Sequence, residues 1–371
     1  MNPAPAIEAT AGDRLERLQI LRGVAVAMVV AFHATSNYLR ADSALLAHGY
    51  SGLLASGVDI FFVISGFVIH YATRRAYGPD VTIDFLKKRV ARIVPLYWLV
   101  TTLVIAIGLF APSLLRSYVF SLDHAVASFA FIPWPRPDGG VFPPLVPGWS
   151  LNFEMMFYAI YAALMTTGRR DLALPLLALV FGAGFLAVHW LGLDPALFIF
   201  GNVIVFEFLA GVALADLWLA RGGHFTRWTG AICLALALPL IACALVDNDL
   251  RWPAQIAGFG LLVAGVLTVG VRPWPAAGRL MTALGDASYS IYLIHPLALS
   301  ALASLARLRG LSQLDLPEIV VMMAIAMASG WAFHHLVETP LLTLARNRMG
   351  IGQPRPATAM ASAFVAPSPQ G

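Results

Sequence analysis

A long apolar segment near the N-terminus carries two polar side chains at a fixed spacing. It runs from Leu18 to His33, with Arg22 close to one end and His33 at the other. In an α-helix, eleven residues rise roughly 16 Å with a net rotation of only about 20°, so both side chains point along one face. The segment therefore predicts a helix that holds a permanent positive charge in line with a proton-transfer group.

The rest of the chain is equally apolar. Of its 371 residues, 59% are hydrophobic and 12% are charged, whereas soluble proteins carry about 25% charged residues. Runs of about 20 apolar residues span a bilayer as helices, so we predict an all-α integral membrane protein with about ten transmembrane helices. The expected spans are residues 18–38, 57–73, 93–112, 148–167, 172–191, 197–219, 229–246, 254–271, 284–305 and 316–342.

Basic residues predict the orientation of these spans. Most of the 24 Lys and Arg residues lie near the two termini and in alternate loops, and basic loops face the cytoplasm. Both termini are therefore expected in the cytoplasm. Residues 1–17 would be a cytoplasmic segment, 18–345 the transmembrane domain and 346–371 a cytoplasmic, disordered tail. The net charge of +4 follows from the same rule, and no basic run with interleaved aromatics indicates a nucleic-acid partner.

Two loops are long enough to hold structure of their own. Residues 73–92 form a basic inner loop with an expected amphipathic helix from Val81 to Arg92. Residues 117–132 are expected to form an interfacial or re-entrant helix that leads into a Pro- and Gly-rich outer loop. Cys233 and Cys243 share one apolar segment, so we expect neither a disulfide framework nor a metal site.

Ionisable residues inside the expected spans fall into two tiers. Such residues are costly in a bilayer and usually face the protein interior or a water-filled cavity. In the predicted orientation, the outer half of the membrane holds His33, Asp59, Glu154 and His295, and the inner half holds Arg22, Arg89, Arg92, His334, His335 and Glu338. A charged donor that docks at the inner side and reacts deeper in the bundle needs such an arrangement.

The inner basic residues are a candidate anion site. Arg89 and Arg92 are three residues apart on an expected helix and share a face. With Lys88 and Arg22, they can bind a polyanion such as the phosphates of coenzyme A. The alternative is that all four are ordinary basic residues of the cytoplasmic side.

The outer tier contains a candidate base. A histidine titrates near neutral pH, so His33 can take a proton from a hydroxyl. A carboxylate can orient it and stabilise its charged form, and Glu154 or Asp59 can play this part. The alternative is a structural hydrogen bond between helices. We interpret His295, which shares a helix face with Tyr292, as structural.

Six segments, in order along the expected spans, carry a family resemblance: Arg22 to His33, Gly57–Phe67, Arg89–Tyr97, Gly148–Glu154, Ser288–Pro296 and Val337–Pro340. Together they resemble the membrane-bound acyltransferase-3 family of bacterial O-acyltransferases, and the resemblance extends from Leu18 to Pro340. Residues Leu151–Tyr158 are similar to the exopolysaccharide acetyltransferase branch of that family.

The resemblance implies a function at the bacterial inner membrane. An acyl group, with acetyl-CoA the expected donor, would pass from cytoplasmic acyl-CoA to a hydroxyl of an exopolysaccharide glycan or its lipid-linked precursor. Polysaccharide biosynthesis proteins are the expected partners, and no metal is needed. The implied catalytic residues are His33, Arg22, Glu154 and Asp59, and the implied donor-binding residues are Arg89 and Arg92. We add Lys88 and Tyr97 to the expected donor-binding residues, because they flank this pair on the same segment.

One other function fits the same pattern. A transporter or exporter of a polysaccharide, a lipid or a small acid would use His33 as a proton relay. It would move its cargo without consuming acyl-CoA. The Arg-x-x-Arg pair beside the membrane favours a nucleotide-bearing donor instead. A scaffold or sensor ranks last, because it gives no reason for polar residues at two depths.

Overall fold

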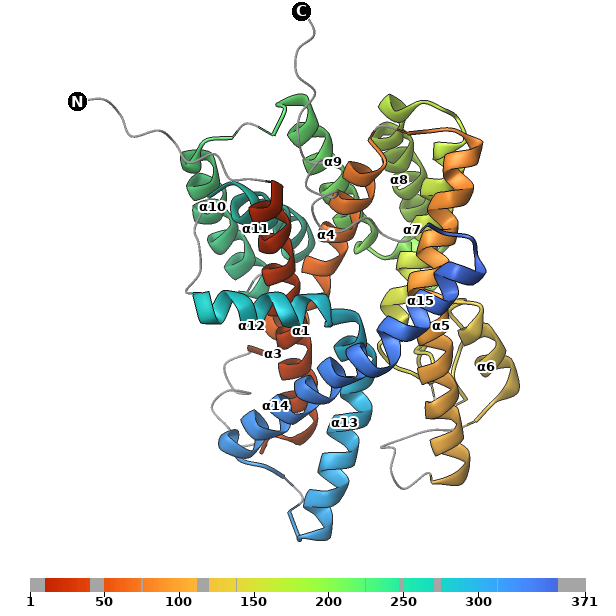
Figure 1. Cartoon of the computed structure of the whole chain (residues 1–371), viewed down its shortest axis with the longest axis vertical. Coiled ribbons are helices and arrows are strands. Elements are labelled where there is room, and N and C mark those ends of the chain that lie inside the picture. The colour runs from red at the N-terminus through yellow and green to blue at the C-terminus, as the bar shows by residue number, and fades with distance from the viewer. Residues whose placement is uncertain are drawn as a thin grey trace, which may run out of the picture.

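The computed structural model of the chain is a bundle of α-helices (Figure 1). It describes residues 11–40, 50–74, 76–111, 120–137, 139–223, 225–246, 250–269, 275–311 and 313–352. The described α-helices are α1 (Ala11–Tyr38), α3 (Tyr50–Ala55), α4 (Gly57–Ala72), α5 (Pro79–Phe110), α6 (Leu122–Phe129), α7 (Gly148–Met165), α8 (Ala173–Leu191), α9 (Val205–Ala220), α10 (Arg227–Val246), α11 (Arg251–Val269), α12 (Pro275–Asp286), α13 (Ser288–Leu308), α14 (Leu316–Phe333) and α15 (Thr339–Arg348).

Eight helical segments in the described chain are long and apolar enough to cross a membrane, and each overlaps a predicted span. They are Glu16–Tyr38, Ser51–Ala72, Pro79–Phe110, Arg170–Leu191, Arg227–Val246, Arg251–Val269, Ser288–Leu308 and Leu316–Arg348. The other two predicted spans, 148–167 and 197–219, form α7 and α9. Helix α9 has only 16 residues, and α7 carries Asn152 and Glu154 within its 18 residues. The membrane orientation of the termini stays a prediction.

Several boundaries differ from the prediction. The expected amphipathic segment and the third span form one helix, α5, which continues through Pro95. The last span is interrupted by a π-helical turn from His334 to Glu338 before α15 begins. The helix expected within 117–132 is α6, and residues 117–119 lie outside the described chain. Residues 1–10 and 353–371 also lie outside the described chain, and the second of these ranges is most of the expected C-terminal tail.

Helix α12 lies across α1 (Figure 1), in a region where the sequence predicted a cytoplasmic loop followed by the ninth span. Two glycines allow the crossing. A Cβ on Gly23 would lie 2.1 Å from the carbonyl oxygen of Met281, and a Cβ on Gly285 would lie 1.9 Å from that of Gln19. The two backbones thus touch, as small residues permit in helix–helix packing. The contact fixes the part of α1 that carries Arg22.

A second glycine pair joins α4 to α9. A Cβ on Gly66 would lie 2.1 Å from the carbonyl oxygen of Phe208, and one on Gly211 would lie 2.1 Å from that of Val63. Beside this crossing, the rings of Phe157 and Phe208 stack with centroids 4.4 Å apart. Helices α4, α7 and α9 therefore form a tightly packed unit, and the face of α4 toward α9 is sealed.

Candidate functional site

Arg22 is the meeting point of several helices. Its Nη2 donates a hydrogen bond to Ser288 Oγ at 2.7 Å, and its Nη1 donates to Gln19 Oε1 at 3.1 Å. The charged side chains that act on it electrostatically are Arg92, Glu154, Asp286 and Glu338. These come from α5, α7, the end of α12 and the π-helical turn. A cluster of charges of both signs thus surrounds the part of α1 that carries Arg22.

The π-helical turn supplies a carboxylate that sequence reasoning did not assign to the site. Glu338 is only 4% exposed. It accepts a hydrogen bond from Ser290 Oγ at 2.6 Å, and His334 Nδ1 lies 2.7 Å from the same oxygen. Single π turns inside α-helices are frequent at functional sites. The available signal was the motif Val337–Pro340, whose glutamate lies in the predicted inner half.

Arg89 is held over two aromatic rings. Its guanidinium carbon lies 5.3 Å from the ring centre of Phe85 and 5.7 Å from that of Tyr158. Its Nε is buried and has no hydrogen-bond partner in the described chain. A buried charged donor without a partner is costly. This nitrogen is therefore available to an anionic ligand.

Glu154 lies with these arginines. Its carboxylate accepts hydrogen bonds from the Tyr158 hydroxyl and, at 3.5 Å, from Ser65 Oγ. It also acts electrostatically on Arg22. The prediction placed Glu154 in the outer tier beside His33, but its described contacts connect it with the arginine cluster.

The other two predicted donor-binding residues point elsewhere. Lys88 forms an ion pair with Asp84 at 2.5 Å, and both side chains are about half exposed. The Tyr97 hydroxyl lies 2.7 Å from Ser128 Oγ, and its ring lies 4.7 Å from that of Phe131. Tyr97 therefore packs against α6 and the segment that follows it, at a distance along α5 from Arg89.

Asp59 belongs to a separate buried cluster. It accepts a hydrogen bond from Gln255 Nε2 at 2.6 Å, and the buried carboxyl group of Glu207 on α9 interacts with it electrostatically. A cavity of about 210 Å³ lies next to the cluster and is lined by Ser56, Arg251 and Gln255, among others.

His33 instead has a second histidine as its neighbour. Its ring centroid lies 5.0 Å from that of His295, with the two planes inclined by 40°. The described contacts of Asp59 and Glu154 do not include His33. Helix α1 is continuous from Ala11 to Tyr38, so Arg22 and His33 are aligned on one helical face as predicted.

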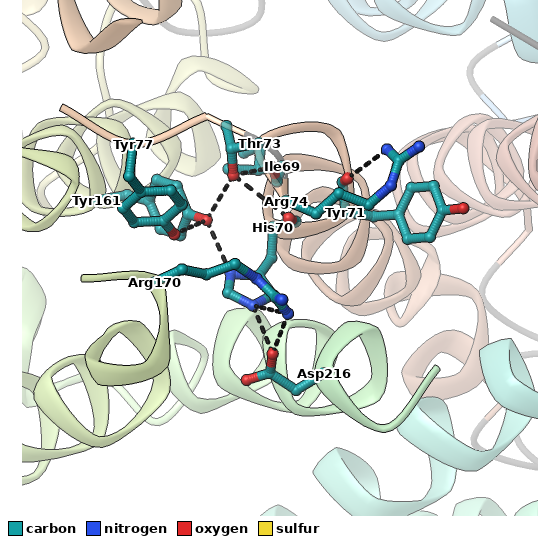
Figure 2. A network of polar contacts seen from close by, with 9 residues as sticks. All are labelled: Ile69, His70, Tyr71, Thr73, Arg74, Tyr77, Tyr161, Arg170 and Asp216. Atoms are coloured by element: carbon teal, nitrogen blue, oxygen red, sulfur yellow. Dashed lines mark hydrogen bonds and ion pairs between the residues drawn. The ribbon is translucent and has the colours of Figure 1, made fainter. Parts of the chain in front are cut away.

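A buried polar network, also absent from the prediction, joins the ends of α4, α7 and α9 (Figure 2). His70 is fully buried. Its Nδ1 lies 2.8 Å from the Tyr161 hydroxyl, and its Nε2 lies 2.8 Å from Asp216 Oδ1. Arg170 donates to the same Asp216 oxygen. The network thus connects a partly exposed ion pair to the buried hydroxyl of Tyr161.

Two further hydroxyls complete the network. Tyr161 Oη lies 2.8 Å from Thr73 Oγ1 and 2.7 Å from Tyr77 Oη (Figure 2). Burial raises the pKa of Tyr77 above its usual value, so this hydroxyl keeps its proton. Phe85, whose ring lies 5.8 Å from that of Tyr161, connects the network to Arg89. The network therefore supports the ring of Phe85, against which Arg89 packs.

Replacing His70 with Phe is expected to lower stability by about 2 kcal/mol, because Tyr161 and Asp216 each lose a buried partner. Tyr77→Phe removes one hydroxyl at the edge of the network and should cost about 1 kcal/mol or less. Thermal unfolding of the purified proteins in detergent measures both effects. Equal midpoints for His70→Phe and the unchanged protein would show that the network does not brace these helices.

A model of the acyltransferase domain family matches residues 15–335. The chain is 35% identical over 305 residues to the exopolysaccharide production protein ExoZ of Rhizobium meliloti (strain 1021), covering 79% of this chain and 91% of that protein. It is 26% identical over 385 residues to the acyltransferase MdmB of Streptomyces mycarofaciens, covering 93% of this chain and 96% of that protein.

A third relative is longer than this chain. The chain is 29% identical over 311 residues to the peptidoglycan O-acetyltransferase OatA of Listeria monocytogenes serovar 1/2a, covering 74% of this chain but 48% of that protein. No solved structure matches. The family model covers most of the chain, including the helices that carry Arg22, Arg89, Glu154 and His295. The protein is therefore a multi-pass membrane acyltransferase and belongs to the acyltransferase-3 family.

Proposed function

We propose that this protein transfers an acyl group, most simply acetyl, from cytoplasmic acyl-CoA to a hydroxyl of an exopolysaccharide glycan or its lipid-linked precursor. The observation that carries the proposal is the arrangement on α1. Arg22 lies within a cluster that includes Arg92, and His33 lies along the same helical face about 16 Å away. An anchored anion and a distant base are what a CoA-dependent transfer requires.

Arg89, Arg92 and Arg22 are assigned to the phosphates of the donor. The buried Nε of Arg89 lacks a partner, and arginine binds phosphate through several donors at once. Lys88 already has Asp84 as its ion-pair partner, so its contribution would be long-range attraction at the entrance. In this proposal Tyr97 packs α5 against α6.

His33 is assigned to the chemical step. In a direct transfer, the acceptor O–H bond breaks and His33 takes the proton, while the oxygen attacks the thioester carbonyl. The C–S bond then breaks, a C–O ester bond forms, and the CoA thiolate receives the proton. In the alternative route, His33 itself carries the acyl group before the acceptor arrives. Both routes leave one acylated hydroxyl and one free CoA.

The two carboxylates take supporting parts in this proposal. Glu154 lies among positive charges and aromatic rings, so it would position Arg22 and balance the charge of the cluster. Asp59 would hold α4 against α11 through its hydrogen bond with Gln255. Both remain within the motifs that the family resemblance singles out.

The nature of the acceptor is supported by a relative. The similar protein from Rhizobium meliloti is named for exopolysaccharide production, and the Listeria relative is named for O-acetylation of peptidoglycan. An exopolysaccharide acceptor at the bacterial inner membrane, with both protein termini in the cytoplasm and biosynthesis proteins nearby, fits the basic residues and the first of these names.

Radiolabelled acetyl-CoA supplied to inverted membrane vesicles tests the proposal. Label should enter an alkali-labile ester on polysaccharide or on lipid-linked sugar, in proportion to the amount of protein. A transporter with His33 as a proton relay would instead move an already acylated or unmodified cargo without release of free CoA. Transport without CoA release would refute the proposal.

A further inference from the structure

His295 has one satisfied nitrogen and one that is buried without a partner. Its side chain is fully buried. Its Nδ1 lies 3.1 Å from the carbonyl oxygen of Ile291, one helical turn earlier. Its Nε2 is buried and has no hydrogen-bond partner in the described chain.

The bond to Ile291 determines where the proton of the neutral ring lies. A carbonyl oxygen can only accept, so Nδ1 must carry the hydrogen. Nε2 of the neutral imidazole is then a lone-pair acceptor. A buried acceptor with no donor is costly, and such an exception calls for an explanation such as a ligand or a catalytic role.

The neighbouring aromatic groups indicate which residue can donate to His295 Nε2. The Tyr292 ring lies 6.0 Å from that of His295, but its hydroxyl is engaged with Ser150 Oγ at 2.7 Å and with the carbonyl oxygen of Pro147 at 3.1 Å. The nearer ring is that of His33, at 5.0 Å. Two imidazoles joined by an N–H···N hydrogen bond of about 2.9 Å have ring centres roughly 5 Å apart.

We propose that His295 is a positioning residue for His33, and this inference rests on the proposed function. The structure holds no hydrogen bond between the two rings. With the ring centroids 5.0 Å apart, a rotation of the His33 ring in the reacting state brings its imidazole N–H to the Nε2 lone pair of His295. When His33 takes the proton of the acceptor hydroxyl, it becomes an imidazolium, and its second N–H donates to His295 Nε2. A buried neutral imidazole thus does for His33 what a carboxylate commonly does for a catalytic histidine.

With His295 in this role, the bonds broken and formed in the transfer are the same. The acceptor O–H bond breaks, its proton lies on His33, and the proton passes to the CoA thiolate as the C–S bond breaks. His295 keeps its own Nδ1 hydrogen throughout, because the Ile291 carbonyl holds it. It therefore stabilises the charged form of His33 without becoming charged itself.

Two substitutions test the roles of the two nitrogens of His295 separately. The side-chain amide of His295→Asn can still donate to the Ile291 carbonyl, but it removes the acceptor at the Nε2 position. His295→Gln can place its amide oxygen near the Nε2 position, which restores an acceptor that has no basicity. The control is His189→Asn, because His189 makes the same type of contact, to the carbonyl of Phe185 at 2.9 Å, on the exposed face of α8.

The kcat for transfer and the KM for acetyl-CoA are measured for each variant in proteoliposomes. We expect His295→Asn to lower kcat about 10- to 100-fold, the effect of losing one hydrogen bond to a charged group, with KM changed less than about twofold. His295→Gln should recover most of the loss, and His189→Asn should leave kcat unchanged. Unchanged kcat in His295→Asn, or an equal loss in His295→Asn and His295→Gln, would overturn the inference.

The same assay separates this inference from the function on which it rests. If the unsubstituted protein releases no CoA and transfers no acyl group, the proposed function fails and the role of His295 fails with it. If it transfers the acyl group but His295→Asn does so equally well, only the role of His295 fails. Thermal unfolding of each variant shows whether a loss of activity reflects a loss of the fold. If His295→Asn is unfolded, His295→Gln decides the question through its values of kcat and KM.

Discussion

Replacement of His33 by Gln is expected to reduce acyl transfer by about 10²- to 10⁴-fold, the usual contribution of a positioned general base. Glutamine fills a similar space and can still form a hydrogen bond, but it cannot take a proton. The KM of His33→Gln for acetyl-CoA should therefore stay close to that of the unsubstituted protein, since the nearest proposed phosphate contact on α1, Arg22, lies about 16 Å along the helix from His33. The measurement is the initial rate of label transfer from acetyl-CoA to polysaccharide in membrane vesicles.

The control for His33 is His189→Gln, on α8. His189 contacts the carbonyl of its own helix and the ring of Phe185, so its replacement should leave transfer within about twofold. Both variants must insert into the membrane in equal amounts, which quantitative immunoblotting establishes. If His33→Gln transfers acyl groups at the normal rate while it is fully inserted, His33 is neither the base nor the acyl carrier.

Removing Arg89 is expected to weaken donor binding about 30-fold or more, because a partly buried guanidinium that contacts an anionic ligand contributes more than a fully exposed one. Arg89→Ala also removes a cation that lies over Phe85 and Tyr158. The effect should appear in KM for acetyl-CoA and in direct binding of CoA, measured by titration calorimetry in detergent.

Lys88 is the matched control for Arg89. It is the adjacent residue on α5, carries the same charge and is paired with Asp84 on an exposed face. Exposed ion pairs contribute about 0–1 kcal/mol, so Lys88→Ala should change CoA affinity by less than about fivefold. Equal losses from Lys88→Ala and Arg89→Ala would mean that the donor responds to the total charge of the inner face, without a specific site at Arg89.

The spans that matched best are those determined by local composition. Hydropathy averages over about 20 residues, so the apolar runs that became α8, α10 and α11 were recognisable without any knowledge of their neighbours. Helix α12 was missed because its role depends on packing. Gly285 is meaningful only once α12 lies against Gln19 of α1. The π-helical turn was missed as well, because a single turn is too short to give a recognisable hydrophobic periodicity in the sequence.

The candidate site shows the same division. Arg22 and His33 are on one helix, so their alignment follows from helical geometry alone. The position of Asp59 depends on which face of α4 packs against α9, and that choice is made by Gly66 and Gly211 at the crossing. The unpartnered nitrogen of His295 was equally invisible, because it requires knowing every atom around the ring. Residues that act across helices therefore needed the structure.

The continuous helix α1 has a consequence for the choice of donor. A rigid rod connects Arg22 to His33, and its length between them is fixed at roughly 16 Å by the helical rise. In the proposed reaction, a donor whose phosphates bind at Arg22 must place its thioester carbonyl at His33. The helix therefore sets the distance between the charged part of the donor and its acyl group. Small activated acids such as acetyl phosphate carry charge and carbonyl side by side and cannot span it. Only carriers with a long arm between the two would satisfy both ends at once.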